Sequence, residues 1–253
     1  MRRFFCDPIP AVGSSADLPL AEAKHALTVL RLEAGSRIGL LDGRGVRAEA
    51  LITRAIRERR ELALGFTVER REQWRLPLVG LHVVVAPPRN RQMDLIIHQC
   101  VELGVARITP VLCEHAVSKP EADRALASWR DTAIAALKQS GNPFLLQIEP
   151  LLTFTAALEK CTAPGYFGTV PEPAAVLHAA QEIKQLAAGG RELTLWIGPE
   201  GGFNSTENAG LAARGLRPLA LGNWTLRVET AVAALTGYLL GAGGDDFHCR
   251  QLE

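Results

Sequence analysis

Apolar and polar positions follow two rhythms along the chain, and the change falls at Pro77. Before Pro77, short runs that alternate apolar and polar residues, such as 36–41 and 46–52, are separated by turn residues. The sequence Asp-Gly-Arg-Gly at 42–45 between these two runs predicts a β-hairpin. A third alternating run at 61–68 and one helix at 20–32 complete the expected content of a small β-barrel domain over residues 1–76.

After Pro77, apolar runs of strand length alternate with amphipathic helical segments. This order is typical of a mostly parallel α/β sheet, and we expect it to form a second domain over residues 77–253. The predicted strands are 78–86, 108–113, 166–170, 193–197 and 216–221. The predicted helices are 93–100, which Gly104 stops, and 121–139, 174–188, 205–214 and 229–240.

Composition narrows the class of protein. With 47% apolar and 22% charged residues the chain is an ordinary globular sequence. Its apolar runs fall well short of the roughly 20 residues of a membrane-spanning helix, and the first residues lack the apolar core of a signal peptide. We therefore expect a cytoplasmic protein with no membrane partner. The five cysteines are scattered and form no Cys-x-x-Cys pair. This pattern favours reduced thiols over disulfides and argues against a metal site.

The charge is unevenly divided. Residues 1–76 carry 14 Lys and Arg against 10 Asp and Glu, whereas the rest of the chain carries 14 against 17. A basic excess favours an anionic partner for the first domain, or it is a solvated surface; charge alone leaves both open.

Two segments carry candidate chemistry. In 195–204, a buried strand runs into the turn Gly-Pro-Glu-Gly-Gly, and Asn204 with Glu207 is typical of a helix-capping pair. Glycines at the carboxyl end of a parallel strand let a ligand approach the backbone closely, although a plain strand-to-helix turn needs glycines too. In 219–231, a second strand end is followed by Arg227, Glu229 and Thr230 just before an apolar helix. These polar residues indicate a site, or they cap the helix.

Together these segments resemble the ribosomal RNA small subunit methyltransferase E family of the SPOUT superfamily. The resemblance rests on IGPEGG at 197–202, LG at 221–222, and LR at 226–227 followed by ETA at 229–231. It extends over most of the chain through RFF at 3–5, His25 with VLR at 29–31, DG at 42–43, ELGV at 102–105 and ITP at 108–110.

The resemblance implies a PUA-like N-terminal β-barrel that binds RNA and a SPOUT-type α/β domain whose chain end forms a trefoil knot. It also implies a homodimer. The implied reaction is methyl transfer from S-adenosylmethionine to N3 of a uridine in 16S ribosomal RNA of the small ribosomal subunit, leaving S-adenosylhomocysteine. Independently, the apolar circumference of the last helix favours either a dimer or burial within its own sheet.

The resemblance also implies roles for particular residues. Arg227 would stabilise negative charge on the uridine, and Glu229 would act as a general base or position Arg227. The implied cofactor-binding residues are Ile197, Gly198, Pro199, Glu200, Gly201, Gly202, Leu221, Gly222, Leu226 and Thr230. Candidates for RNA contact, by charge and by resemblance, are Arg2, Arg3, Lys24, His25, Arg31, Arg89 and Arg91.

The chain departs from the usual family pattern in segments expected near the substrate. The departures are His98-Gln99 in place of Gln-Lys, Lys138-Gln139 and Asn142 in place of Glu-Gln and an Arg, Trp224-Thr225 in place of Arg-Ile, and Val228 in place of Thr. Two alternatives therefore stay open: a paralogue that methylates another RNA position, and a non-catalytic RNA-binding factor of ribosome assembly. A nucleotide-dependent dehydrogenase is disfavoured because no Gly-x-Gly-x-x-Gly follows the first strand of the second domain.

Overall fold

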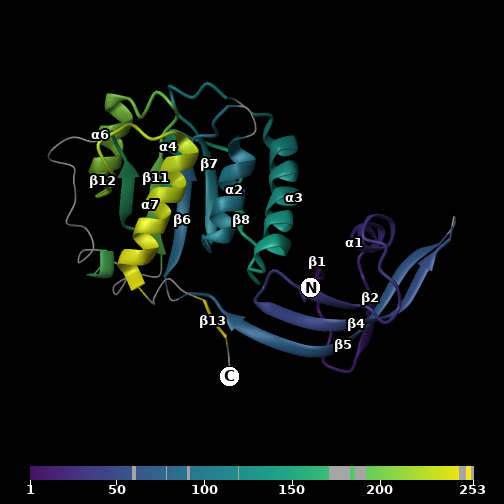
Figure 1. Ribbon diagram of the computed structural model, residues 1–253. Coiled ribbons are helices and arrows are strands. Elements are labelled where there is room, and N and C mark those ends of the chain that lie inside the picture. Colours follow the sequence, from purple (N-terminus) through teal and green to yellow (C-terminus); the bar gives the residue numbers. More distant parts are fainter. Residues whose placement is uncertain are drawn as a thin grey trace. The chain divides into compact units, whose positions relative to one another are not determined.

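The computed structural model describes residues 1–58, 61–77, 79–89, 92–118, 120–170, 183–185, 192–244 and 249–251 (Figure 1). The chain divides into two compact units. Unit 1 comprises Met1–Leu76, Leu137–Leu145 and Cys249–Glu253, and unit 2 comprises Pro77–Ala136 and Leu146–His248. The functional division into domains at 1–76 and 77–253 stays a prediction.

Unit 1 is built on a sheet with the strand order β1-β3-β4-β5-β13, and β2 also pairs with β5. The strands are β1 (Arg3–Phe5), β2 (Ser15–Asp17), β3 (Arg37–Leu41), β4 (Val46–Arg57), β5 (Leu62–Arg75) and β13 (Arg250–Gln251). Strands β3 and β4 pair antiparallel, which confirms the predicted hairpin. Its turn is fixed by the buried Asp42 carboxylate, which accepts hydrogen bonds from the backbone N–H groups of Arg44 at 2.7 Å and Val46 at 2.9 Å.

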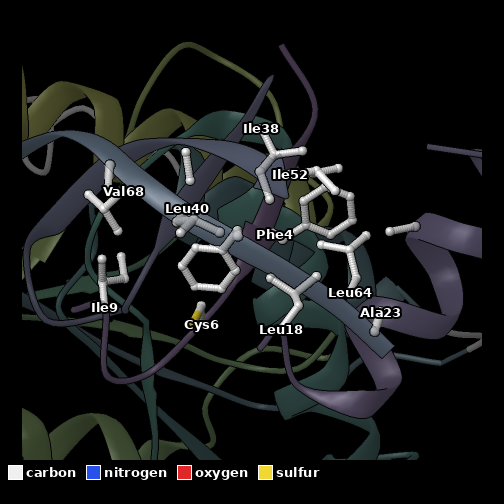
Figure 2. Packing of buried hydrophobic residues seen from close by; sticks show 14 of the residues in the cluster. Phe4, Cys6, Ile9, Leu18, Ala23, Ile38, Leu40, Ile52, Leu64 and Val68 are labelled. Atoms are coloured by element: carbon white, nitrogen blue, oxygen red, sulfur yellow. The ribbon is translucent and has the colours of Figure 1, made fainter. Parts of the chain in front are cut away.

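The core of unit 1 lies on one face of this sheet. Figure 2 shows Phe4 of β1, Leu40 of β3, Ile52 of β4 and Leu64 of β5 packed together. Each of these side chains is at most 1% exposed. Burial of such a side chain stabilises the fold by about 1.5–3 kcal/mol. Strands β4 and β5 extend beyond their predicted ends. Their outer residues are exposed or half-buried, so the alternation on which the prediction rests stops before the strands do.

The single helix predicted at 20–32 is two elements. An α-helix, α1 (Leu20–Lys24), continues as a π-helical turn, η1 (His25–Val29). The wider turn is closed by the hydrogen bond from Leu30 N–H to the His25 carbonyl at 3.2 Å. It keeps Ala26 and Leu27 buried in the core, a preference that the helical period alone does not encode.

Unit 2 contains a parallel sheet with the strand order β12-β10-β11-β6-β7-β8, and β9 also pairs with β7. The strands are β6 (Gly80–Val85), β7 (Arg107–Leu112), β8 (Gln147–Ile148), β9 (Leu152–Thr153), β10 (Gly165–Gly168), β11 (Glu192–Ile197) and β12 (Arg217–Leu219). All the strand pairs of this sheet are parallel. The predicted mostly parallel α/β fold is therefore confirmed, whereas the trefoil knot stays a prediction.

Helices cover both faces of this sheet. They are α2 (Gln92–Glu102), α3 (Ala122–Ser140), α4 (Phe154–Lys160), α6 (Ser205–Ala213) and α7 (Val228–Gly243). Val84 and Trp196 pack with Phe154 of α4 and Leu211 of α6 in one cluster. Alternate residues of the strands point to the opposite face, where α2 and α7 lie side by side (Figure 1).

Some predicted elements differ from the structure. The sequence pattern does not predict strands β8 and β9 or helix α4. The two strands have only two residues each, which is too short to leave a periodic pattern. The helix predicted at 174–188 lies outside the described residues except for 183–185, which are helical, and Leu78 at the start of the first predicted strand also lies outside them. In the part of the chain that the structure describes, no helix is long and apolar enough to cross a membrane.

A polar cluster occupies the amino-terminal end of the unit 2 sheet. The Arg107 guanidinium donates to both Glu192 carboxylate oxygens, at 2.7 and 2.6 Å. The neighbouring His82 ring shares a hydrogen bond with the Thr109 hydroxyl at 2.8 Å and is almost buried. Burial, with the Arg107 charge, lowers the pKa of His82 from 6.5 to about 3. His82 is therefore neutral in the folded protein at physiological pH.

The depressed pKa of His82 predicts that the folded protein loses stability in acid. Because the His82 pKa is depressed on folding, its contribution to stability is present above pH 6.5 and is lost as the pH falls towards 3. Between pH 7 and pH 5 we expect His82 to remove about 2 kcal/mol from the free energy of unfolding, since one pKa unit corresponds to about 1.4 kcal/mol. Urea unfolding at the two pH values measures this loss. The loss of stability between the two pH values should be about 2 kcal/mol smaller in His82→Asn than in the wild type. It should persist in the control His115→Gln, which alters an exposed histidine. A loss in His82→Asn equal to that of the wild type would contradict the prediction.

Candidate functional site

A cavity of about 450 Å³ lies at the carboxyl ends of three neighbouring strands of unit 2, β10, β11 and β12. This edge is where open parallel sheets hold their ligands, and the volume is in the range of about 300–1,000 Å³ typical of small-molecule sites. Its walls come from the loops that follow these strands and from the start of α7. The lining residues are 168–170, 197–203, 208, 219–221, 224–228, 231 and 235.

The first wall is the turn after β11. The Gly202 N–H donates to the Pro199 carbonyl at 2.8 Å, and Gly202 has a φ of +72°, a conformation that favours glycine. At Gly198, an added Cβ would lie 3.1 Å from the backbone nitrogen of Phe203. The turn is therefore tight, and at its three glycines it presents backbone without a side chain to the cavity.

Residues next to the turn hold it in place. Asn204 and Glu207 form a capping box at the start of α6, as predicted. The second Glu207 carboxylate oxygen accepts from the backbone N–H of Glu114 at 2.9 Å, and the Glu114 carboxylate accepts from the Asn204 side-chain amide at 2.6 Å. His115 Nδ1 lies 3.3 Å from the Gly202 carbonyl oxygen. The loop after β7 thus supports the turn after β11.

Sequence reasoning missed the roles of Glu114 and His115. The available signal was their position just after a predicted strand that ends in the same parallel sheet. Cys113 precedes them, and burial, followed by the charge of Glu207, raises the pKa of its thiol to about 12. Such a thiol is a poor nucleophile at neutral pH, so Cys113 does not suggest covalent chemistry at this edge.

The second wall is the loop after β12, which leads to α7. Arg227 is the N-cap residue of α7 and makes no side-chain capping bond. Among the residues that the structure describes, none forms a hydrogen bond or an ion pair with its guanidinium, which is exposed on the cavity. The guanidinium is therefore available for a ligand.

Most of the predicted cofactor-binding residues meet at this cavity. Ile197, Gly198, Pro199, Glu200, Gly201, Gly202, Leu221 and Leu226 all line it. Gly222, Glu229 and Thr230 do not line it. Glu229 lies in the first turn of α7, where a carboxylate complements the helix dipole, and no hydrogen bond joins it to Arg227.

The predicted RNA-contact residues are more dispersed. In unit 2, the Arg89 backbone N–H makes a long hydrogen bond, 3.5 Å, to the Glu200 carboxylate at the edge of the cavity; Arg91 lies outside the described residues. In unit 1, Arg3 is engaged within the fold, because its guanidinium donates to the carbonyls of Lys138 at 3.3 Å and Gln139 at 2.9 Å. The remaining candidates, which are exposed, are Arg2, Lys24, His25 and Arg31.

Two of the residues that depart from the family pattern also have structural partners in unit 1. Lys138 donates to the Glu22 carboxylate at 2.7 Å, and the Asn142 side-chain carbonyl accepts from the Phe144 backbone N–H at 3.0 Å. Trp224 is different, because its side chain is exposed at the cavity. Within the described ranges, no group of three or more His, Cys, Asp or Glu residues could hold a metal ion.

The chain matches two families of known domains. Residues 75–240, more than half of the chain, match the family described as RNA methyltransferase domain. Residues 19–60 match the family described as RNA methyltransferase PUA domain. The first match contains both walls of the cavity, and the second lies in unit 1.

Individual relatives carry matching names. The ribosomal RNA small subunit methyltransferase E of Synechocystis sp. is 28% identical over 232 residues, which cover 90% of this chain and 74% of the relative. The protein of that name from Mycobacterium tuberculosis is 28% identical over 242 residues, covering 92% and 89%. The resemblance drawn from the sequence motifs is therefore confirmed.

Solved structures share the fold over nearly the whole chain. A ribosomal RNA small subunit methyltransferase E from Neisseria gonorrhoeae, bound to S-adenosylmethionine, is 25% identical with a TM-score of 0.79, covering 94% of this chain and 96% of that one. A methyltransferase-like protein from Legionella pneumophila, solved in complex with the same cofactor, is 23% identical with a TM-score of 0.83, covering 95% and 97%.

Proposed function

Because this chain belongs to the RNA methyltransferase family, we propose that it transfers a methyl group from S-adenosylmethionine to N3 of one uridine in 16S ribosomal RNA. The observation that carries the proposal is that three findings concern the same part of the chain, the carboxyl edge of the unit 2 sheet. These are the family match, the cavity, and the guanidinium of Arg227, which has no hydrogen bond or ion pair with a described residue. The relatives' names support small-subunit ribosomal RNA as the substrate.

The cavity fits the proposed cofactor. The turn at 198–202 offers backbone N–H and C=O groups to polar parts of a ligand, while Ile197, Leu221 and Leu226 offer apolar surface to a ring. Gly198 and Gly202 add no side chain to this wall. The relatives solved with S-adenosylmethionine bound have the same fold, which supports the same ligand here.

Arg227 is the residue on which the chemistry depends most. The cofactor, when bound, supplies an electrophilic methyl group. Uridine N3 must give up its proton to water or to a base, and the negative charge that develops on N3 is shared with the two flanking carbonyl oxygens. This charge is lost as the N3–carbon bond forms and the methyl–sulfur bond breaks, which leaves S-adenosylhomocysteine. The guanidinium of Arg227, which is unpaired among the described residues, would stabilise this charge as it develops.

Glu229 has a secondary role in the proposal. Its carboxylate is half-buried in the first turn of α7 and does not line the cavity. An ordinary carboxylate is a weak base for so weak an acid as uridine N3. We therefore propose that Glu229 positions the start of α7. It would accept the N3 proton only if the substrate moved towards it.

The remaining parts of the proposal concern the assembly. The match of residues 19–60 to a PUA domain supports RNA binding by unit 1. A homodimer and a trefoil knot are proposed from the family resemblance alone, and a cytoplasmic location from the site of ribosome assembly. The last helix adds no argument for the dimer, because its large side chains Val232, Leu235 and Leu239 are buried within the chain itself.

The proposal is tested by transfer of labelled methyl groups to 16S ribosomal RNA and to 30S subunits that lack native N3-uridine methylation. We expect incorporation at the N3 atom of a single uridine. Incorporation at another position, or none despite measurable binding of S-adenosylmethionine, would instead support the paralogue with a different RNA target.

A non-catalytic RNA-binding factor is the second candidate. The observation in its favour is the set of altered residues in segments expected near the substrate, in particular His98, Gln99 and Asn142. Calorimetry separates it from an enzyme, because a factor without catalytic function should give no heat with S-adenosylmethionine.

A further inference from the structure

We propose that Trp224 is a stacking platform for a nucleobase of the RNA substrate at the mouth of the cavity. This inference rests on the proposed function, because it takes RNA as the substrate. It adds a binding residue to the site that neither the motifs nor the relatives assign. The observations behind it are the exposure of Trp224, its neighbours and its place in the loop after β12.

Trp224 is the most exposed of the large apolar side chains in the described part of the chain. Its exposed fraction is 80%, whereas Trp129 is 7% exposed and Trp196 is completely buried. The fourth tryptophan, Trp74, is half-buried and has the Arg47 guanidinium 5.5 Å from its ring centroid. An indole ring exposed to this extent gives up most of the stabilisation that burial would provide, so its position suggests a partner.

The neighbours of Trp224 define what that partner must be. Trp224 lines the cavity together with Val170, which is 58% exposed, and with Arg227 three residues further along the chain. The mouth thus combines a flat aromatic face, an apolar patch and a cation that no described residue pairs. A nucleotide offers the complementary features, a flat base and a negative phosphate.

The substitution of the family's usual arginine is consistent with this partner. Arginine and tryptophan differ in charge, but each has a flat face on which a nucleobase can stack. The loop leaves the ring accessible: Gly222 has a φ of +71°, and residues 222–225 are all exposed. A base that leaves its RNA stack to enter the cavity would therefore find an aromatic surface on the same cavity as Arg227.

The test uses binding and needs no turnover. Fluorescently labelled oligouridine is titrated with wild-type protein, Trp224→Ala, Trp224→Phe and Leu95→Ala. We expect Trp224→Ala to weaken oligouridine binding about 5- to 100-fold, the range that one base–aromatic stack supports, and Trp224→Phe to restore most of the affinity. Leu95→Ala is the matched control, since Leu95 is an exposed apolar residue on α2, and it should bind as the wild type does.

Intrinsic fluorescence identifies the interacting chemistry. Oligouridine should quench the emission of Trp224, measured as the difference between the wild type and Trp224→Phe, whereas inorganic polyphosphate of the same charge should not. Affinity for S-adenosylmethionine should stay within about twofold in Trp224→Ala.

Several results would overturn the inference. They are unchanged oligouridine affinity in Trp224→Ala, no oligouridine binding by the wild type, or an equal loss of cofactor affinity, which would indicate stacking on the cofactor's adenine. A Trp224 emission that changes with protein concentration alone would indicate a second copy of the chain instead. Failure of the proposed function is seen separately, as absence of methyl incorporation by the wild type.

Discussion

Replacing Arg227 by alanine should lower the rate of methyl transfer to ribosomal RNA at least about 100-fold, with little change in affinity for S-adenosylmethionine. Removal of one group that stabilises developing negative charge commonly costs about 10²–10³ in rate. The effect should fall on the chemical step, because the guanidinium forms no hydrogen bond or ion pair with a described residue and supplies no side-chain cap to α7. Single-turnover transfer of labelled methyl groups measures the rate, and calorimetry measures cofactor affinity.

Two further variants show whether charge or geometry matters at this position. Arg227→Lys keeps the positive charge without the planar guanidinium, and we expect an intermediate rate. Glu229→Gln should have a smaller effect than Arg227→Ala, because Glu229 does not line the cavity. If Arg227→Ala transferred methyl groups at the wild-type rate, or if Glu229→Gln were the more severe change, the assignment of Arg227 would be wrong.

Replacing Gly202 by valine should weaken binding of S-adenosylmethionine by about tenfold or more, which corresponds to about 1.4 kcal/mol. Gly202 has a φ of +72° on the wall of the cavity, and a β-branched residue there would force the turn after β11 out of shape. The displaced backbone would no longer present the same N–H and C=O groups to the ligand. Calorimetric titration with the cofactor measures the loss.

The chain offers a matched control in Gly215. Its φ is +79°, and, as at Gly202, an added Cβ would meet nothing within 4 Å. Gly215 lies between α6 and β12 and does not line the cavity. Both valine variants should therefore lose stability by about 1–3 kcal/mol. Only Gly202→Val should lose cofactor affinity; equal affinities in the two variants would show that the turn does not bind the cofactor.

The local elements of the chain follow from its sequence. The β3–β4 hairpin is encoded by the alternation on either side of residues 42–45, and the capping box of α6 by the spacing of Asn204 and Glu207. These features depend on contacts between residues a few positions apart, so a periodic pattern or a short motif is enough to specify them. The glycine turn at 198–202 and Arg227 also stand out as short local motifs, whereas their roles in a site are implied by the family resemblance.

Local pattern was insufficient where tertiary packing selects the conformation. The π-helical turn η1 satisfies the same helical pattern as an α-helix and differs in how Ala26 and Leu27 are buried in the core. The depressed pKa of His82 likewise comes from burial beside Arg107, 25 positions away in the chain. Neither the burial nor the neighbour can be read from the residues that flank His82.

The sequence by itself thus determined most of the longer elements, the class of fold and the two segments to which we assign the chemistry. The tertiary structure decided how they meet. The strand order β12-β10-β11 brings three strand ends from distant parts of the chain to one cavity, and the loop after β7 supplies Glu114 and His115 to support it. The tertiary structure also leaves Trp224 exposed at the mouth of the cavity. The physical reason is that the pairing of parallel strands is non-local: apolar periodicity specifies which face of a strand is buried, whereas the neighbours of the strand are selected by packing across the whole sheet.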